Sequence, residues 1–184
     1  VASLESEMRL EVRRMNQTIT IGMKMGSVET PEGKLLEMRV ASDMALATVK
    51  SIYRFEDDGV RVITEQLGRT SEKVLPLPPG KWLTPREAER FEAAEIAKGA
   101  KEFSYETIDV STGLRVVSVT RTIIGPSNVE VMGKTVPAIE WETTNSATPG
   151  ITVREFVDDR GEMVRSSIDM AGIQMEILAS DKEF

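Results

Sequence analysis

The side chains that could carry acid–base chemistry in this sequence are carboxylates, and two adjacent pairs stand out. Asp57 with Asp58, and Asp158 with Asp159, could serve as an acid and a base or as calcium ligands. Each pair directly precedes Gly or Arg-Gly, where aspartate is favoured because its side chain accepts hydrogen bonds from the local backbone. We therefore interpret both pairs as hairpin turns rather than as catalytic or metal sites.

A larger set of acidic residues lies within one segment, at the spacing of a helix. Its glutamates alternate with basic residues, so that opposite charges fall three or four positions apart, which is typical of a solvated helix face. The residues are Glu87, Glu89, Glu92 and Glu95, interleaved with Arg86, Arg90 and Lys98.

Two residue types that dominate enzyme active sites are missing. The 184 residues include no histidine and no cysteine. This absence removes the imidazole base, the thiolate nucleophile and the common soft metal ligands. We therefore predict that the chain is not an enzyme, and we assign it no catalytic, cofactor-binding or metal-binding residue and no cofactor.

The net charge and the hydropathy of the sequence limit the kinds of binding partner that we expect. A formal net charge of −7 and the lack of a basic stripe argue against binding to nucleic acid. No stretch approaches the roughly 20 uncharged apolar residues that cross a bilayer. We expect membrane contact only through an N-terminal signal or anchor that has been removed.

Alternating apolar and polar residues predict a mainly β chain. Met8, Leu10 and Val12 alternate with charged residues, and Ile19 resumes the alternation with a shifted phase that indicates a bulge. The segment 35–55 contains good helix formers, but its β-branched residues favour two strands, one to about residue 45 and one from residue 48.

Turn signals then recur at the spacing of an antiparallel meander. We expect about ten strands in one β-rich domain spanning residues 1–184, possibly excised from a longer protein, with a strongly curved antiparallel sheet that forms a half-barrel or a sandwich. The turn segments are TPEG at 30–33, EDDG at 56–59, STG at 111–113, GPSN at 125–128, MGK at 132–134, NSATPG at 145–150, DDRG at 158–161 and AG at 171–172.

One helix is expected near residues 84–98. Thr84 is suited to cap its first turn, Pro85 fits the first helical position, and Glu87 completes a capping box with Thr84. Gly99 is a C-terminal stop signal. The helix is short and carries small side chains, so we expect it to cover a sheet edge or the mouth of a concavity.

Tryptophan and methionine supply the candidate apolar surfaces. We expect Trp141, on the same side of its strand as Ile139, to pack in the core, and Trp82 to pin the proline-rich loop. Core filling is the default for methionine, and an adaptable apolar cavity is the alternative. The methionines near the first strands are Met8, Met15, Met23, Met25, Met38 and Met44.

The order of segments resembles a known family over nearly the whole chain. The stretches SVETPEGKLLEM, LPLPPGKWLTPREAERF, KGAKEFSYETID and VREFVDDRGEMVRSSIDMAGIQMEI are similar to the region that precedes the catalytic domain in bacterial transglutaminase-like proteins, especially those of planctomycete type. The closing segment places Phe156, Val157, Asp158, Asp159, Gly161 and Gly172 at the family's positions.

This resemblance implies a non-catalytic accessory domain. The family's catalytic domain uses a Cys, His and Asp triad, and the chain lacks the first two residues. The implied role is to pack on, or present substrate to, a C-terminal catalytic domain of the same polypeptide or another protein, in the periplasm or cell envelope. The alternative is an envelope protein that binds a lipid or another apolar ligand in a half-barrel concavity.

Overall fold

A computed structural model describes residues 1–14, 17–44, 47–111, 113–170 and 173–178. The chain divides into two compact units, which we describe separately. The first unit comprises Val1–Ala88 and Ile108–Val116, and the second comprises Glu89–Thr107 and Val117–Phe184.

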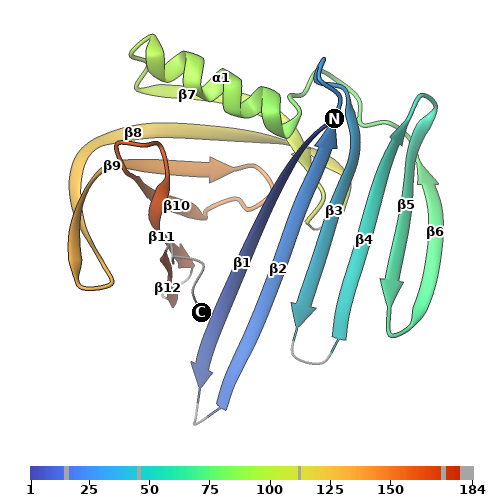
Figure 1. Cartoon of the computed structure of the whole chain (residues 1–184), viewed down its shortest axis with the longest axis horizontal. Coiled ribbons are helices and arrows are strands. Elements are labelled where there is room, and N and C mark those ends of the chain that lie inside the picture. Colours follow the sequence, from blue (N-terminus) through green and yellow to red (C-terminus); the bar gives the residue numbers. More distant parts are fainter. Residues whose placement is uncertain (15–16, 45–46, 112, 171–172, 179–184) are drawn as a thin grey trace. The chain divides into compact units, whose positions relative to one another are not determined.

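The first unit is built on a six-stranded antiparallel sheet in which the strands lie side by side in chain order (Figure 1). Every connection is therefore a hairpin, as expected for a meander. The strands are β1 (Ala2–Arg14), β2 (Gln17–Glu29), β3 (Leu35–Met44), β4 (Ala47–Glu56), β5 (Gly59–Gln66) and β6 (Arg69–Leu75).

The core of the first unit follows from the period-two pattern of its strands. Val60 and Val62 on β5 are buried. They lie directly opposite Phe55 and Tyr53, respectively, on the neighbouring strand β4. Burial of one such side chain stabilises the fold by about 1.5–3 kcal/mol. The complete cluster is Leu35, Met38, Val40, Tyr53, Phe55, Val60, Val62, Ile108 and Val110.

The second sheet also has six antiparallel strands in chain order, from β7 to β12 (Figure 1). Its longest members are β8 and β9, which form a hairpin closed by Met132 and Gly133. The strands are β7 (Glu102–Asp109), β8 (Arg115–Val131), β9 (Lys134–Asn145), β10 (Thr152–Val157), β11 (Met163–Met170) and β12 (Ile173–Leu178).

Helix α1 (Pro85–Ala97) begins and ends where the sequence predicts. The Thr84 amide donates to the Glu87 carboxylate at 2.9 Å and the Glu87 amide donates to the Thr84 hydroxyl at 3.3 Å, which confirms the capping box. At the other end the amide of Gly99, with φ of 78°, donates to the Ile96 carbonyl, and the Ala100 amide donates to the Glu95 carbonyl. These bonds form a Schellman motif. Among the described residues no helix has the length and apolar character that crossing a bilayer requires.

The mainly β class with one helix near residues 84–98 is confirmed. The division of residues 35–55 into two strands is also confirmed, because β3 ends at Met44 and β4 begins at Ala47. The turns predicted at TPEG and DDRG lie between consecutive strands, and those at EDDG, MGK and NSATPG connect consecutive strands and overlap them by a terminal residue. The turn predicted at STG includes Thr112, which lies outside the described residues. The turn predicted at AG lies outside the described residues.

Two details of the strand prediction are wrong. Val12 and Ile19 do not lie on one bulged strand but pair with each other across the β1–β2 hairpin, which accounts for the shifted phase. GPSN is not a turn, because β8 continues through it. The register shifts between Ile123 and Gly125, and Gly125 has a φ of 147°, so the glycine accommodates a bulge instead of ending the strand.

Candidate functional site

Both aspartate pairs lie in hairpin turns, as predicted. Asp57 is exposed and accepts a hydrogen bond from Lys34 Nζ at 2.8 Å. Asp158 is buried, and its Oδ1 atom accepts the amides of Arg160 and Glu162 at 2.9 and 3.0 Å. These backbone bonds, with the Arg160 guanidinium, hold the pKa of Asp158 below its usual value. Neither pair brings two free carboxylates together for acid–base chemistry.

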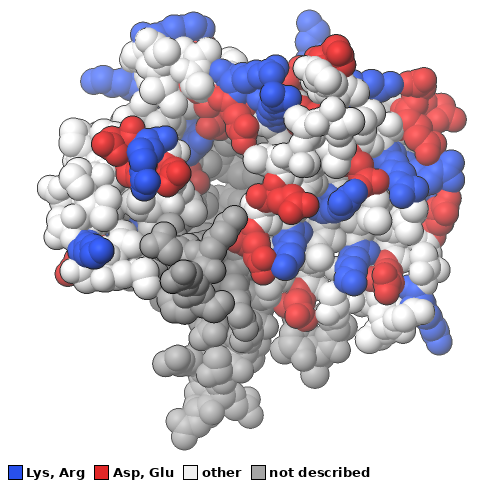
Figure 2. Space-filling model, in the orientation of Figure 1, with Lys and Arg blue, Asp and Glu red and all other residues white. Residues whose placement is uncertain are grey.

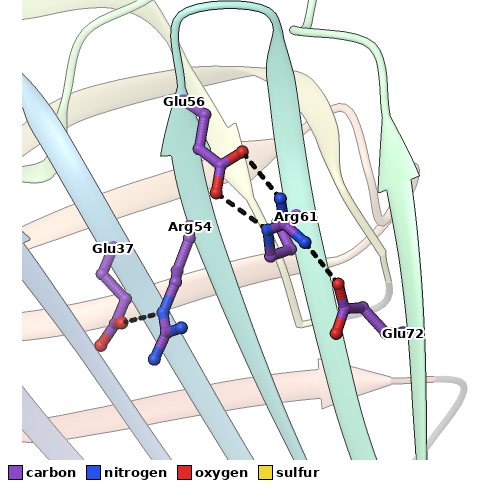
Figure 3. Close-up of polar contacts among 5 residues, drawn as sticks. All are labelled: Glu37, Arg54, Glu56, Arg61 and Glu72. Atoms are coloured by element: carbon purple, nitrogen blue, oxygen red, sulfur yellow. Dashed lines mark hydrogen bonds and ion pairs between the residues drawn. The ribbon is translucent and has the colours of Figure 1, made fainter.

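A row of alternating charges crosses the first sheet from β3 to β6 (Figure 3). Glu37 accepts from Arg54 at 3.1 Å, and Arg61 donates to Glu56 at 2.9 Å and to Glu72 at 2.5 Å. These side chains are mostly half-exposed, and each ion pair of this kind contributes less than about 1 kcal/mol. The five residues alternate in sign and carry a formal net charge of only −1, so the row offers no strong field of one sign to a charged ligand.

The rest of the visible surface repeats this mixture. Basic and acidic side chains alternate over the face shown in Figure 2, without a large patch of one sign. Within the part of the chain that the structure describes, no three carboxylates come close enough together to hold a metal ion.

A buried carboxylate in the first unit fixes the start of α1. Glu29, on β2, is only 2% exposed. Its carboxylate accepts the Thr84 hydroxyl at 2.8 Å and the Arg86 amide at 3.1 Å. The positive end of the helix dipole favours an anion at this place. Sequence analysis missed Glu29, although it stands at the end of an alternating strand where a charged residue departs from the apolar pattern.

The glutamates of α1 do not share one solvated face, so that interpretation is wrong in part. Glu89 is exposed and Glu95 pairs with Lys98 at 2.6 Å, as expected of surface residues. Glu92 is different because its side chain is only 18% exposed. It accepts a hydrogen bond from the Tyr105 hydroxyl at 2.5 Å and forms an ion pair with Arg121.

Arg121 is the centre of this network in the second unit. Its guanidinium also donates to Glu155 at 2.6 Å and lies 4.5 Å above the ring of Trp141. Thr143 donates to the same Glu155 oxygen at 2.8 Å. Burial, followed by the hydrogen bond to Glu92, strongly raises the pKa of the Tyr105 hydroxyl. The network joins the helix to the sheet and engages the carboxylates of Glu92 and Glu155, while the buried Nε atom of Arg121 and the indole nitrogen of Trp141 have no hydrogen-bond partner among the described residues.

The two tryptophans have the structural roles predicted for them. Trp141 is 6% exposed and packs edge-on against Phe103, which in turn contacts Phe91 of the helix. Trp82 donates its indole N–H to the Pro78 carbonyl at 3.3 Å and packs against Phe55. It therefore pins the proline-rich loop to the first unit.

A pocket of about 310 Å³ opens on the second sheet. Three of its residues are cross-strand neighbours, because Pro126 on β8 faces Ile139 on β9, which faces Val157 on β10. The lining residues are Pro126, Ser127, Asn128, Pro137, Ala138, Ile139, Val157, Asp158 and Asp159.

This pocket continues the sheet face that carries the Arg121 network. Alternate residues of β9 share a face, so Trp141 and Ile139 lie on the same side and about 7 Å apart along the strand. Trp141 is covered by aromatic and guanidinium groups, whereas Ile139 is 38% exposed. The pocket is therefore the uncovered part of an otherwise packed apolar face, which is the arrangement expected of a binding surface.

No methionine is among the described residues that line this pocket, so it is not the methionine-lined cavity considered as an alternative. Met38 is buried in the core of the first unit, and Met25 packs against that core. Met23 is partly buried, while the side chains of Met8, Met15 and Met44 lie outside the described part. The pocket itself has prolines, Ala138, Ile139 and Val157 as its apolar lining.

Comparison with known proteins supports the fold. No protein-family model and no curated protein matches the chain. It is similar to the crystal structure of a β-barrel-like protein of the domain of unknown function DUF1849 from Brucella abortus. The TM-score is 0.62 with 15% sequence identity, and the match covers 94% of this chain and 78% of that chain. At this identity the likeness concerns the fold alone.

Proposed function

We propose that this chain is a non-catalytic binding domain that holds a small apolar or amphipathic ligand in the pocket above Ile139. The observation that carries the proposal is the exposed apolar floor of that pocket beside a packed region of the same sheet face. A volume of about 310 Å³ lies at the lower end of the range of ligand-binding pockets. A ligand that covers Ile139 gains about 25 cal/mol for each Å² of apolar surface removed from water.

Binding is favoured over catalysis by the state of the polar groups near the pocket. The carboxylate of Asp158 is occupied by donors of its own turn. Ser127 and Asn128 are neutral, and the chain has no histidine or cysteine to activate them. The pocket thus offers apolar contact and a few polar groups that orient a ligand.

The fold is compatible with this role. Antiparallel sheets of barrel-like proteins often hold one small ligand against side chains of their inner face. The similar structure is named β-barrel-like, and its domain is one of unknown function. The likeness therefore supports the architecture on which the proposal depends, and the ligand is inferred from the pocket.

The accessory role beside a transglutaminase-like catalytic domain stays a prediction, as does a periplasmic or envelope location. Both depend on the resemblance of the sequence segments. The complete reading frame of the gene tests them, because an accessory domain requires a Cys, His and Asp catalytic domain in the same polypeptide or in a partner.

The binding proposal is tested with Nile red, a neutral fluorophore whose emission rises in apolar surroundings. We expect saturable binding to the folded protein and a loss of about tenfold in affinity for Ile139→Glu, because the new carboxylate is placed against the apolar ligand. The matched control is Ile124→Glu, since Ile124 is 52% exposed on β8 and does not line the pocket.

Two results would overturn the proposal. One is the absence of saturable binding to the native protein. The other is an equal loss of affinity in Ile139→Glu and Ile124→Glu, which would show that the fluorophore binds exposed apolar residues in general. Circular dichroism of both variants verifies that they fold.

A further inference from the structure

One carboxylate at the pocket is not engaged in the way that its neighbour is. Asp159 lines the pocket and is exposed. Asp158, directly before it, accepts the Arg160 side chain at 3.0 and 3.1 Å as well as the two turn amides. No hydrogen bond or ion pair joins Asp159 to another residue in the described ranges.

The cation that follows Asp159 in the sequence, Arg160, is already neutralised. The Arg160 guanidinium lies 3.0 Å from Asp158 and 3.2 Å from Glu162, so it is shared between two other carboxylates and acts on Asp159 only through space. None of the pocket residues is a lysine or an arginine. The pocket therefore combines apolar lining residues with one available anionic group, the carboxylate of Asp159.

We infer that the preferred ligand is a cationic amphiphile, with its apolar body over Ile139 and an ammonium group against Asp159. This inference rests on the proposed function, since it names the ligand class of the same pocket. A fatty acid of equal chain length presents a second anion to Asp159 and to a protein with a net charge of −7, so it is disfavoured.

The expected preference is modest because Asp159 is solvent-exposed. An exposed ion pair contributes about 0.2–1 kcal/mol, which corresponds to a roughly 1.5- to 5-fold tighter binding of the amine. Such a preference decreases with ionic strength, since the Debye length falls from about 10 Å at 0.1 M salt to about 3 Å at 1 M.

The test compares linear alkyl compounds of one chain length with an amine, an alcohol or a carboxylic acid as the head group. Each displaces Nile red from the native protein at neutral pH and low salt. We expect the amine to bind more tightly than the alcohol and the alcohol more tightly than the acid. Asp159→Asn should abolish the difference between amine and alcohol while leaving alcohol binding unchanged.

The control variant is Asp58→Asn, which alters the second aspartate of the other pair in an exposed turn of the first unit. It removes one negative charge without changing the pocket, so the amine preference should persist. If it abolishes the preference as Asp159→Asn does, the effect is one of net charge and the inference is wrong.

The remaining outcomes separate this inference from the proposed function. If amine, alcohol and acid bind equally well and Asp159→Asn has no effect, the pocket binds apolar ligands but Asp159 does not select among them. If the acid binds most tightly, the ligand class is the opposite one. If no compound displaces the fluorophore, the proposed function itself fails.

Discussion

Two glutamates, one in each compact unit, show different ways of keeping a carboxylate away from solvent. Glu29 on β2 is almost fully buried and is bound by a hydroxyl and a backbone amide at the start of α1. Glu92 is less buried and is bound by the Arg121 guanidinium and the Tyr105 hydroxyl. The first carboxylate is stabilised by neutral donors and a helix dipole, and the second by a full counter-charge.

The difference has a consequence for substitution. When a carboxylate is bound only by neutral donors, its replacement by an amide still gives those donors an oxygen atom to bind. A cation that lies between two carboxylates has no neutral substitute, because its removal leaves like charges facing each other. The second unit should therefore be more sensitive to loss of a charge than the first.

The largest expected effect is that of Arg121→Met. It leaves Glu92 and Glu155 without their shared cation, and we expect a loss of about 2–4 kcal/mol in the free energy of unfolding. Urea denaturation followed by circular dichroism measures it. In a double-mutant cycle with Glu92→Gln, the double variant should lose clearly less than the sum of the two single variants. Strict additivity would show that Arg121 and Glu92 do not interact, which would contradict the statement that a counter-charge stabilises Glu92.

The next effect concerns Glu29. Glu29→Ala leaves the Thr84 hydroxyl and the Arg86 amide without their acceptor in a buried place, for an expected loss of about 2–3 kcal/mol. Glu29→Gln keeps one acceptor oxygen and should lose about half as much. The same urea titrations decide this, with Glu72→Ala on the half-exposed charge row as a control that should change stability by less than about 1 kcal/mol. Equal losses for Ala and Gln would mean that the charge, not the acceptor geometry, is what Glu29 supplies.

Alkaline pH separates the two units in another way, because the protein's two tyrosines are Tyr53 in the first unit and Tyr105 in the second. Burial raises the pKa of both hydroxyls, and the bond to Glu92 raises that of Tyr105 further. A raised folded-state pKa gives stability that is fully present below about pH 10 and is lost as pH rises through the folded-state value.

We therefore expect Tyr105→Phe to be less stable by about 1 kcal/mol at neutral pH, since one hydrogen bond is lost, but to lose stability more slowly above pH 10. Tyr53→Phe should flatten the alkaline limb less. Thermal unfolding at a series of pH values measures both limbs. Identical alkaline limbs in the native protein and in Tyr105→Phe would contradict the raised pKa of the Tyr105 hydroxyl.

Some of these features could be predicted from the sequence because their causes are local. The capping box of Thr84 and Glu87, and the stop at Gly99, depend on residues within one or two turns of helix. The inward position of Glu92 could not be predicted in this way. Its partner Arg121 is 29 positions away, so helical spacing alone gave it the same status as the exposed Glu89.

The pocket escaped prediction for a related reason. Pro126, Ile139 and Val157 become neighbours only through the pairing of β8, β9 and β10, whereas the sequence GPSN predicts a turn at the position where β8 continues. The methionines, which are dense near the start of the chain, predict an apolar surface at the first strands instead. Apolar composition indicates that a surface exists somewhere, but strand register decides which residues form it.

Strand β6 has no turn signal before it in the sequence, because an apolar residue begins its hairpin turn. The β5–β6 hairpin closes with Leu67 and Gly68, at φ of 50° and 71°, where Asn-Gly is the usual sequence signal. The second unit uses the same solution, since Met132 has a φ of 51° before Gly133. The two units thus differ in how they treat carboxylates but share a strained apolar residue at a hairpin tip.

This shared feature gives the smallest predicted effect, and it has the opposite sign. Leu67 and Met132 are 76% and 61% exposed, so neither stabilises the fold by packing, while a left-handed conformation is unfavourable for both. Leu67→Asn and Met132→Asn should each raise the free energy of unfolding by about 0.5–1 kcal/mol, and we expect the two gains to add because each acts on the backbone of its own hairpin turn. Leu67→Ala is the matched control, since it removes the apolar side chain without supplying a residue that favours this conformation. A gain for Ala as large as that for Asn would attribute the effect to lost exposed apolar surface, and a loss of stability in the Asn variants would show that these side chains make contacts that hold the tips.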